Sequence, residues 1–379
     1  MILLLASAIA SLVSSLVNAT FATVSAEDLW RTEPPMHYAR AAHAVVSDGK
    51  SLYALAGTGA GGAPVLVFER FDGKSWRDEG RIPGPGLNAP AAVALNGKIY
   101  LIGGFETDTN VPSAGVYVYD TTTKTWSQAA PLLAPRGGHS AVVLEGKIHV
   151  LGGGNSKSTI ADHDVFEPAK NAWTALAPLP RAEGSPAAVA FSGKLYAVGG
   201  RSGFSDFGAV DIYDPGTNSW SAGPSIDPRG TAGAVVYCGT IYVFGGESQV
   251  RRQSLGDVLR LKHDGAWELV ASMPTPRNFA RAVILDDAVY VVGGSPTPEA
   301  SHASIGSAIV ERYRGSCGRG RTSNDRNGEI WAVTLTGRKW PLADAWRPRN
   351  NLFLESGSHE DKSSGQPLIR GSRDGTSLQ

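Results

Sequence analysis

The sequence has 379 residues, of which 42% are hydrophobic and 18% charged, with 46 glycines and 23 prolines. This composition excludes a globally disordered chain and suits many short strands joined by tight turns, because Gly and Pro supply the backbone angles that turns need. Lys plus Arg (35) equals Asp plus Glu (35), so no overall charge draws the protein to nucleic acid or to an anionic membrane. Its two cysteines, Cys238 and Cys317, are too few for a disulfide framework or a zinc pattern.

The N-terminal segment, residues 1–26, carries no charge, and Ile2–Val17 is largely apolar or small. Val24-Ser25-Ala26 fits a small-residue cleavage site directly before Glu27. We therefore interpret residues 1–26 as a secretory signal peptide and expect a secreted or periplasmic protein. The usual positive charges at the start are missing. An uncleaved membrane anchor, or a misassigned start, is therefore the alternative, because the apolar stretch is nearly long enough to span a bilayer.

From Trp30 onward, two markers repeat with a common period of about 47 residues. The first marker is a tryptophan, found at Trp30, Trp76, Trp126, Trp173, Trp220 and Trp267. The second is a pair of small residues that ends an apolar run, found at Ala56-Gly57, Gly103-Gly104, Gly152-Gly153, Gly199-Gly200, Gly245-Gly246 and Gly293-Gly294. Because two independent markers share one period, we infer a repeated structural unit.

Each unit is predicted to contain four strands. A small apolar run such as Ala141–Leu144 is followed by a short turn and a second strand such as Leu195–Val198, which the Gly pair ends. A variable loop leads to a third strand such as Val210–Asp214, and a polar turn leads to the Trp strand. Runs of β-branched and aromatic residues separated by turn residues indicate strands and hairpins. Four strands per period of this length make one propeller blade.

The Gly pair, the aromatic-Asp end of the third strand and the Trp after it resemble the Kelch-repeat family over about Asp28 to Tyr313. The resemblance implies an all-β fold, a six-bladed Kelch β-propeller, as in exported Kelch proteins of the bacterial type. Two units depart from the pattern, because Ala56 replaces the first Gly of its pair and Leu259–Leu261 replaces an aromatic strand. We interpret the repeated Gly, Trp and Tyr residues as scaffold.

The ring is expected to close where the two ends of the propeller meet. The unit whose third strand is Ile309–Tyr313 lacks a Trp strand, whereas Trp30 stands upstream of the first complete unit. Pairing these segments completes a sixth blade and removes two open sheet edges. We therefore assign residues 27–314 to the propeller.

The repeat pattern stops after the sixth unit. Residues 315–379 are irregular and polar, with runs such as Gly318–Arg321 and Ser363–Gln366. The tryptophans in this segment lack the repeat context; they are Trp331, Trp340 and Trp346. We expect a largely disordered tail.

Strand alternation places the variable loop after each Gly pair on the same face as the connection that precedes each first strand. Variable loops on a rigid scaffold are where binding residues concentrate. The loops on this face are expected at about residues 58–64, 105–114, 155–162, 201–208, 247–256 and 295–307. Among their charged residues, Arg201 and Glu247 are candidates for ligand contact.

A second group of candidates is a set of arginines at one register, close to the start of the first strand. Its members are Arg40, Arg136, Arg229 and Arg277, with Arg181 two residues earlier in its unit. His43 and His139 stand three residues further on in two units. In Kelch substrate adaptors such arginines line a peptide-binding funnel, so the resemblance implies an acidic or carboxylate-bearing ligand. The alternative is that these arginines bond loop carbonyls and neighbouring blades.

Two enzyme functions remain as alternatives to the binding function. Gly230–Ala234 and the segment Gly245-Gly246-Glu247 resemble a blade of N-acetylneuraminate epimerases, in which case Glu247 with Glu106 or Arg201 would do the acid–base chemistry of a sugar epimerase or mutarotase. Galactose oxidase is also built on a Kelch propeller, but a copper site needs more than His43 and His139.

We therefore expect a monomeric binding protein that uses the loop-rich face. Its ligand would be a protein segment or a small acidic or sugar ligand. We expect no metal, no cofactor and no nucleic-acid partner.

Overall fold

The computed structural model describes residues 29–298, 306–315, 317, 331–333 and 339–341. The chain divides into two compact units, Met1–Ser316 and Cys317–Gln379, which are described separately here. The expected signal peptide lies outside the described residues. Among the described residues, no helix is both long and apolar enough to cross a bilayer.

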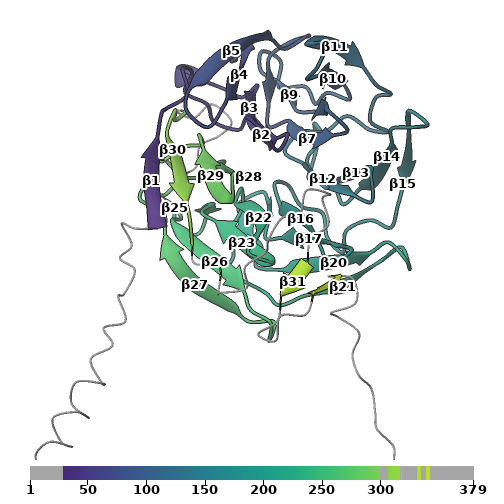
Figure 1. Cartoon of the computed structure of the whole chain (residues 1–379). Coiled ribbons are helices and arrows are strands. Elements are labelled where there is room, and N and C mark those ends of the chain that lie inside the picture. Colours follow the sequence, from purple (N-terminus) through teal and green to yellow (C-terminus); the bar gives the residue numbers. More distant parts are fainter. Residues whose placement is uncertain (1–28, 299–305, 316, 318–330, 334–338, 342–379) are drawn as a thin grey trace, which may run out of the picture. The chain divides into compact units, whose positions relative to one another are not determined.

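The first unit contains six four-stranded antiparallel sheets arranged as the blades of a propeller, which confirms the predicted fold (Figure 1). Strands a to d of each blade run outward from the axis. Blade one consists of β2 (Ala44–Ser47), β3 (Leu52–Leu55), β4 (Val67–Phe71) and β5 (Trp76–Arg81). Blade two consists of β7 (Ala91–Leu95), β8 (Lys98–Ile102), β10 (Val116–Asp120) and β11 (Thr125–Gln128). Blade three consists of β12 (Ser140–Leu144), β13 (Lys147–Leu151), β14 (His163–Glu167) and β15 (Ala172–Ala175).

The second half of the ring repeats this order. Blade four consists of β16 (Ala187–Phe191), β17 (Lys194–Val198), β20 (Val210–Asp214) and β21 (Ser219–Ala222). Blade five consists of β22 (Gly233–Tyr237), β23 (Thr240–Phe244), β26 (Asp257–Leu261) and β27 (Trp267–Ser272). Blade six consists of β28 (Arg281–Leu285), β29 (Ala288–Val292), β30 (Val310–Tyr313) and β1 (Trp30–Glu33).

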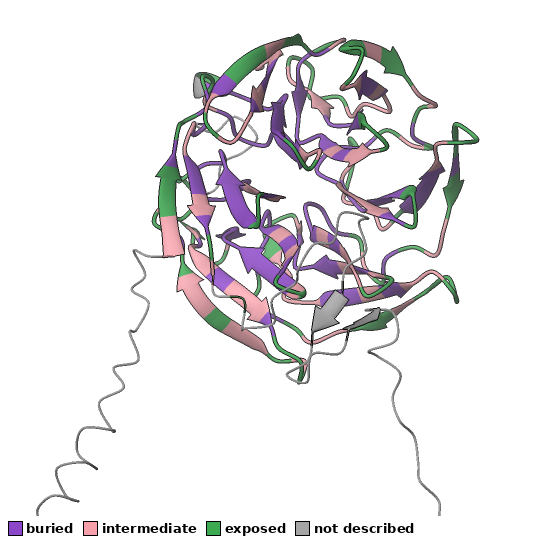
Figure 2. Cartoon of the chain, in the orientation of Figure 1, coloured by how far each residue is buried: buried purple, intermediate pink, exposed green. Residues whose placement is uncertain are grey.

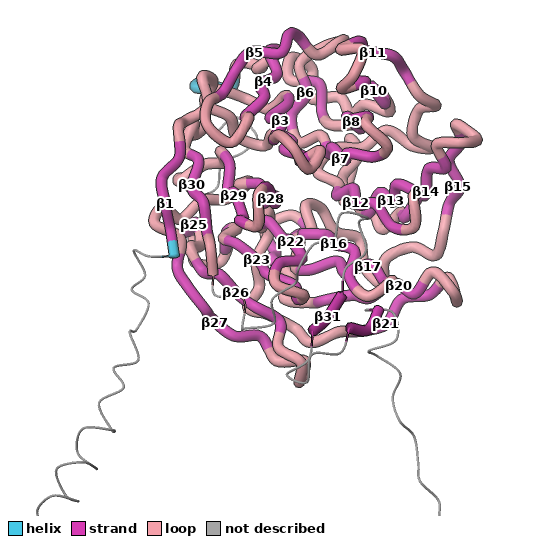
Figure 3. The backbone as a smooth tube through the Cα atoms, viewed as in Figure 1, coloured by secondary structure: helices cyan, strands magenta, loops and turns pink. Residues whose placement is uncertain are grey.

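Short elements decorate the connections between these strands (Figure 3). They are the ladders β6 (Leu87–Asn88) with β9 (Phe105–Glu106), β18 (Arg201–Ser202) with β19 (Ser205–Asp206), and β24 (Glu247–Ser248) with β25 (Gln253–Ser254), and the 3-10 turn η1 (Ala60–Gly62).

The ring closes as the sequence predicts, because β1 pairs antiparallel with β30 as the outer strand of blade six. Trp30 lies opposite Tyr313 in the register, and their ring centroids are 5.0 Å apart. The Trp30 ring also meets Phe244 of blade five edge-on at 6.2 Å. Aromatic packing therefore joins the two ends of the ring to the neighbouring blade.

The core of the propeller lies between adjacent blades, where the inner and middle strands are buried and the outer strands are partly exposed (Figure 2). Four of the outer-strand tryptophans also donate a hydrogen bond to the preceding blade. For example, Trp173 Nε1 donates to Ala130 O at 2.8 Å and Trp220 Nε1 donates to Ala177 O at 2.8 Å. The period of the tryptophans thus reflects a blade-to-blade contact that four blades share.

The pair after strand b consists of small residues because the backbone of the next blade's connection approaches it closely. Gly152 has a φ of 60°, and a Cβ there would lie 2.3 Å from Glu183 O of the next blade's connection. Blade one departs from the pattern because Ala56 holds the equivalent place, and it accepts the same left-handed conformation at a φ of 58°. The geometry, not the glycine itself, is therefore what repeats.

The described residues of the second unit form a short antiparallel ladder, β31 (Trp331–Val333) with β32 (Lys339–Pro341). The sequence did not predict this pairing, because the tryptophans of both strands lack the repeat context. The remainder of that predicted tail, including Trp346, lies outside the described residues.

Candidate functional site

One face of the propeller gathers the two kinds of connection that strand alternation predicts to share it. Isolated bridges join the segment before strand a to the segment after the small pair, as in Gly137 with Gly154, Gly184 with Arg201, and Gly230 with Glu247. These bridges hold each loop against the entry to its own blade. We refer to this side, formed by the a-strand entries and the b–c loops, as the loop face.

The register arginines lie in the interior beneath the loop face. Arg40, Arg136 and Arg277 are fully buried and Arg229 is 1% exposed. Each one reaches a carboxylate on strand c, or at its start, in its own blade. The closest nitrogen–oxygen distances are Arg40 to Glu69 2.9 Å, Arg136 to Asp164 2.6 Å, Arg229 to Asp257 3.2 Å and Arg277 to Glu311 2.7 Å.

Three of these guanidinium groups also donate to a backbone carbonyl of the small-residue pair, and Arg136 donates to Asp162 O instead. Arg40 Nη1 donates to Ala56 O at 2.8 Å, and Arg277 Nη1 donates to Gly293 O at 2.9 Å. Burial disfavours the charged form and lowers the pKa of both guanidinium groups, and the paired glutamates oppose that shift. The structure therefore does not place these four arginines in a peptide-binding funnel, as had been expected. They hold loops and strands together, as the alternative interpretation proposed.

In blade four a glutamate takes the position that an arginine holds in four other blades. Glu183 takes the register place and is fully buried, whereas Arg181 is partly exposed. Both Asp211 and Glu183 lie within ion-pair distance of the Arg181 guanidinium. Burial raises the pKa of Glu183 to about 7, because the nearby Arg181 only partly offsets its desolvation. Arg181 thus also belongs to an interior charge cluster.

His43 and His139 are buried beneath the loop face rather than exposed on it. Neither ring makes a side-chain hydrogen bond, and the backbone acceptors that act on the rings are Val292 for His43 and Ile102 for His139. A Cβ at Gly293 would lie 2.5 Å from Cε1 of His43, and one at Gly103 would lie 2.7 Å from Cε1 of His139. Desolvation lowers the pKa of His139 to about 3 and lowers that of His43 well below its usual range, so both rings are neutral near pH 7.

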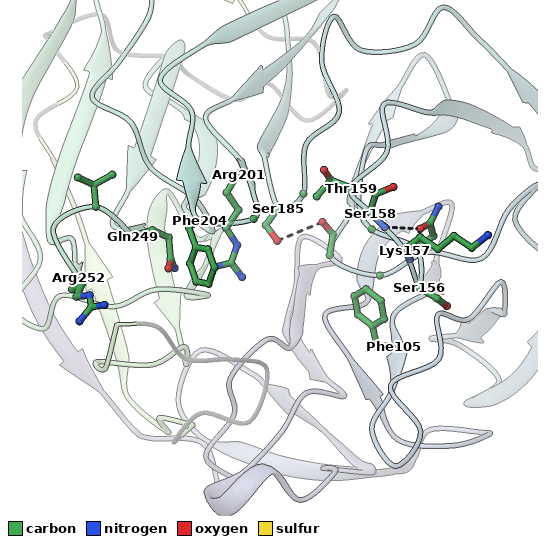
Figure 4. Close-up of a pocket in the computed structure, with 17 residues that line it drawn as sticks. Phe105, Ser156, Lys157, Ser158, Thr159, Ser185, Arg201, Phe204, Gln249 and Arg252 are labelled. Carbon is green, nitrogen blue, oxygen red and sulfur yellow. Dashed lines mark hydrogen bonds between the residues drawn. The ribbon is translucent and has the colours of Figure 1, made fainter.

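A cavity of about 800 Å³ opens on the loop face over blades two to five. Its lining comes from the loop of residues 154–159, the β18–β19 hairpin and the tip of the β24–β25 hairpin, together with Phe105 (Figure 4). The lining contains Lys157, Arg201 and Arg252 but no Asp or Glu. We call this the face pocket, and its charge suits an anionic ligand.

Arg201 is the most firmly held cation of the face pocket. Its Nη1 donates to Glu247 Oε1 at 2.6 Å, and its guanidinium carbon lies 5.5 Å from the centroid of the Phe279 ring. Its side chain is 18% exposed, so part of the guanidinium faces the pocket. A donor fork fixed in this way loses little freedom when it binds a carboxylate.

The three loops that line the face pocket are tied to one another. Thr159 Oγ1 and Ser202 Oγ lie 2.6 Å apart, which joins the loop of blade three to the hairpin of blade four. Asp206 Oδ2 accepts a hydrogen bond from Gln249 N at 2.5 Å, which joins the hairpins of blades four and five. The pocket wall is therefore continuous across three blades.

Apolar side chains stand on the rim of the same pocket. Phe204, at the tip of the β18–β19 hairpin, is 89% exposed, and Val250, at the tip of the β24–β25 hairpin, is 83% exposed. Phe204, Phe105 and Arg201 all line this pocket (Figure 4). Exposed apolar groups next to fixed charges are typical of a surface that binds a partner.

Of the predicted site residues, the structure brings only Arg201 to the face pocket. Glu247 is fully buried behind it and serves as its anchor. Glu106 lies on β9 outside the lining and accepts a hydrogen bond from Thr109 Oγ1 at 3.2 Å. Of the groups expected for epimerase chemistry, Glu247 therefore lies next to Arg201, but neither Glu247 nor Glu106 lines this pocket.

The described residues contain one group with metal-ligand types close together: His37, Glu69 and Asp78. Glu69 is already bonded to Arg40, and His37 Nδ1 lies 3.0 Å from Asp78 Oδ1. Hydrogen bonding within the protein accounts for this arrangement. Neither His43 nor His139 belongs to it.

Sequence reasoning missed Phe204, Lys157 and Arg252 as site residues. The available signal was the Gly203-Phe204 tip between two short polar segments, because a large apolar residue at a turn tip has no core to enter. It also missed the carboxylates of the third strands, whose acidic side chains interrupt otherwise apolar runs.

Two family descriptions match the chain. The Attractin/LZTR1 beta-propeller description matches residues 99–332, and the KLHDC2/KLHL20/DRC7 Kelch-repeats domain matches residues 17–179. Among curated proteins, Kelch-like protein 35 of Mus musculus is 30% identical over 140 residues, which cover 36% of this chain and 23% of that protein. Alpha-scruin of Limulus polyphemus is 29% identical over 154 residues, which cover 37% of this chain and 17% of that protein.

The chain thus spans less than a quarter of the length of these curated relatives. The solved structure of YjhT aligns with a TM-score of 0.62 and 17% identity, over 73% of this chain and 95% of that one. At this identity the likeness shows the fold alone.

The interior role of the register arginines predicts a large loss of stability when one is removed. Arg277→Met removes the buried donor that serves Glu311 Oε2 and four backbone carbonyls, so the free energy of unfolding in urea should fall by about 3–5 kcal/mol. The matched control is Arg251→Met, because Arg251 is exposed and its closest carboxylate is 3.8 Å away. Equal stability of the two variants would contradict the assignment.

Proposed function

The chain belongs to the Kelch-repeat β-propeller family, and on that basis we propose that it is a binding protein whose face pocket captures an acidic protein segment with apolar side chains. The observation that carries this proposal is the lining of the face pocket. It holds three cations, no carboxylate and exposed apolar rim residues.

The charge of the pocket supports an acidic ligand over a neutral one. Arg201 is held by Glu247 and Phe279, so its remaining donors are oriented before a ligand arrives. Lys157 and Arg252 stand on different loops of the same pocket and extend the positive field along it. A segment with spaced carboxylates would meet all three, and salt would weaken the complex.

The apolar rim supports a protein segment over a small sugar acid. Phe204 and Val250 stand at the tips of two hairpins and are almost fully exposed. A small ligand at Arg201 would leave both in solvent, whereas an extended segment could cover them while it bonds the cations. The volume of about 800 Å³ is also large for a monosaccharide.

A sugar epimerase would need a positioned acid and base at the ligand. The face pocket offers none among its lining residues, and Glu247 is committed to Arg201. We therefore propose binding, and not epimerase catalysis, as the function.

We also propose that the protein is exported. The support for export is the uncharged, largely apolar segment 1–26, which ends in small residues that suit a cleavage site.

Selection from a random peptide library tests the binding proposal. The peptides captured by the wild-type protein should be acidic and contain apolar residues. Arg201→Gln should weaken the best of them by about 10-fold to 100-fold, the range for a charge-assisted hydrogen bond. Phe204→Ala should weaken it about 10-fold through lost apolar contact.

Each variant in this test has a matched control outside the pocket. Arg251→Gln removes an exposed arginine and Leu269→Ala removes an exposed apolar residue, and neither position lines the pocket. Because Arg201→Gln leaves Glu247 buried without its donor, Lys157→Gln provides a charge deletion at an exposed loop residue. Selection of neutral or basic peptides, or affinities that none of the pocket variants changes, would rule the proposal out.

The export proposal predicts a processed protein. When the full sequence is produced in a secreting host, intact mass spectrometry should show a chain that begins at Glu27. A mature protein that retains residues 1–26 would contradict cleavage and favour a membrane anchor.

A further inference from the structure

The central channel of the propeller is lined by one equivalent position from each blade. The innermost strands begin with Ala44, Ala91, Ser140, Ala187, Gly233 and Arg281, and each of these residues pairs with the one directly before the small pair. All six line a cavity of about 180 Å³ on the axis, around which the a strands stand in Figure 1. Five of the positions are small, and the sixth carries a long cationic side chain.

Arg281 is the charged residue in this lining, and it has no carboxylate partner among the described residues. Its one hydrogen bond runs from Nε to His43 O of blade one, at 2.9 Å. The terminal Nη1 and Nη2 groups make no hydrogen bond to the described protein and so remain available to the channel. Burial lowers the pKa of Arg281 to about 10, so the side chain still carries its charge near neutral pH.

This lack of a partner sets Arg281 apart from the other interior arginines. Arg40, Arg136, Arg229 and Arg277 each have a carboxylate within 3.2 Å. A guanidinium in a confined space without a counter-charge is costly, since desolvation is not offset by an ion pair. The remaining donors of Arg281 therefore call for an anion that the chain itself does not supply.

The surroundings of Arg281 provide space and a second polar group. Small side chains at the five equivalent positions leave the channel open beside the guanidinium. His139 lines the same cavity and is 2% exposed; its ring makes no side-chain hydrogen bond, and the backbone of Ile102 is the acceptor that acts on it. A neutral imidazole keeps one N–H that can donate to a bound anion. Ser140 Oγ, in contrast, is already bonded to Pro186 O.

We propose that the channel mouth is a binding site for a carboxylate, held by the two terminal nitrogens of Arg281 with His139 as the neighbouring donor. The planar fork of a guanidinium matches the two oxygens of a carboxylate better than it matches a spherical anion. The carboxylate belongs either to a small free acid or to the end of a segment bound in the face pocket.

The second source is sterically reasonable because the two cavities adjoin along the chain. Gly138 and Ser185 line the face pocket, and the next residues, His139 and Pro186, line the channel cavity. The inference nevertheless goes beyond the proposed function, since Arg281 does not line the face pocket. Either site can therefore fail without the other.

Thermal unfolding of the full chain in sodium acetate and in sodium chloride of equal ionic strength tests the channel site. With acetate at about ten times its dissociation constant, linkage predicts a midpoint about 3 °C above that in chloride. Arg281→Gln should abolish this difference, and Arg251→Gln should keep it. Broadening of the [13C]acetate NMR signal by the wild type, and its loss in Arg281→Gln, gives a second readout that does not depend on stability.

The proposal is overturned if acetate and chloride give equal midpoints and the wild type leaves the acetate signal sharp. It is equally overturned if the acetate effect survives in Arg281→Gln. Face-pocket peptides made with a free or an amidated C-terminus identify the source. Amidation that weakens binding to the wild type but not to Arg281→Gln supports the segment's end as the occupant, and an acetate effect with no amidation effect supports a free acid.

Discussion

The constraint on which the structure depends is that a buried guanidinium must find an acceptor. In four blades an arginine enters the interior before strand a, and a carboxylate from strand c or its first residue meets it within 3.2 Å. In three of these blades the same arginine also donates to a backbone carbonyl of the small pair, as Arg277 does to Gly293. One side chain therefore joins the entry loop, the small pair and the third strand of such a blade.

The same constraint decides which cations are available to a ligand. The register arginines are satisfied and buried, so they hold the scaffold. Arg201 has an acceptor in Glu247 but remains partly exposed at the edge of the face pocket. Arg281 has only a backbone carbonyl. An arginine whose charge is already paired within the protein binds an external carboxylate poorly, and one that lacks a carboxylate partner binds it better.

The ring could be predicted from the sequence because its markers are local and periodic. The Trp positions mark the outer strand of each blade and the small pairs mark the end of strand b, and Trp30 without its own blade indicated the closure with Tyr313. The site was less predictable, because the partner of a register arginine lies about thirty residues away and is an ordinary acidic residue in a strand. Arg277 with Glu311 and Arg40 with Glu69 are such pairs. Arg281 carried a readable signal, since it stands where the other five units place Ala, Ser or Gly.

The central functional claim is that ligands meet the loop face over blades three to five. Hydrogen exchange of the protein with and without its best selected acidic peptide tests that claim most directly. The account predicts slower exchange in residues 154–160, 201–206 and 247–254, with no change in the a–b turns on the opposite face at residues 145–147, 192–194 and 238–240. Protection confined to those turns, with the loops unchanged, would contradict it.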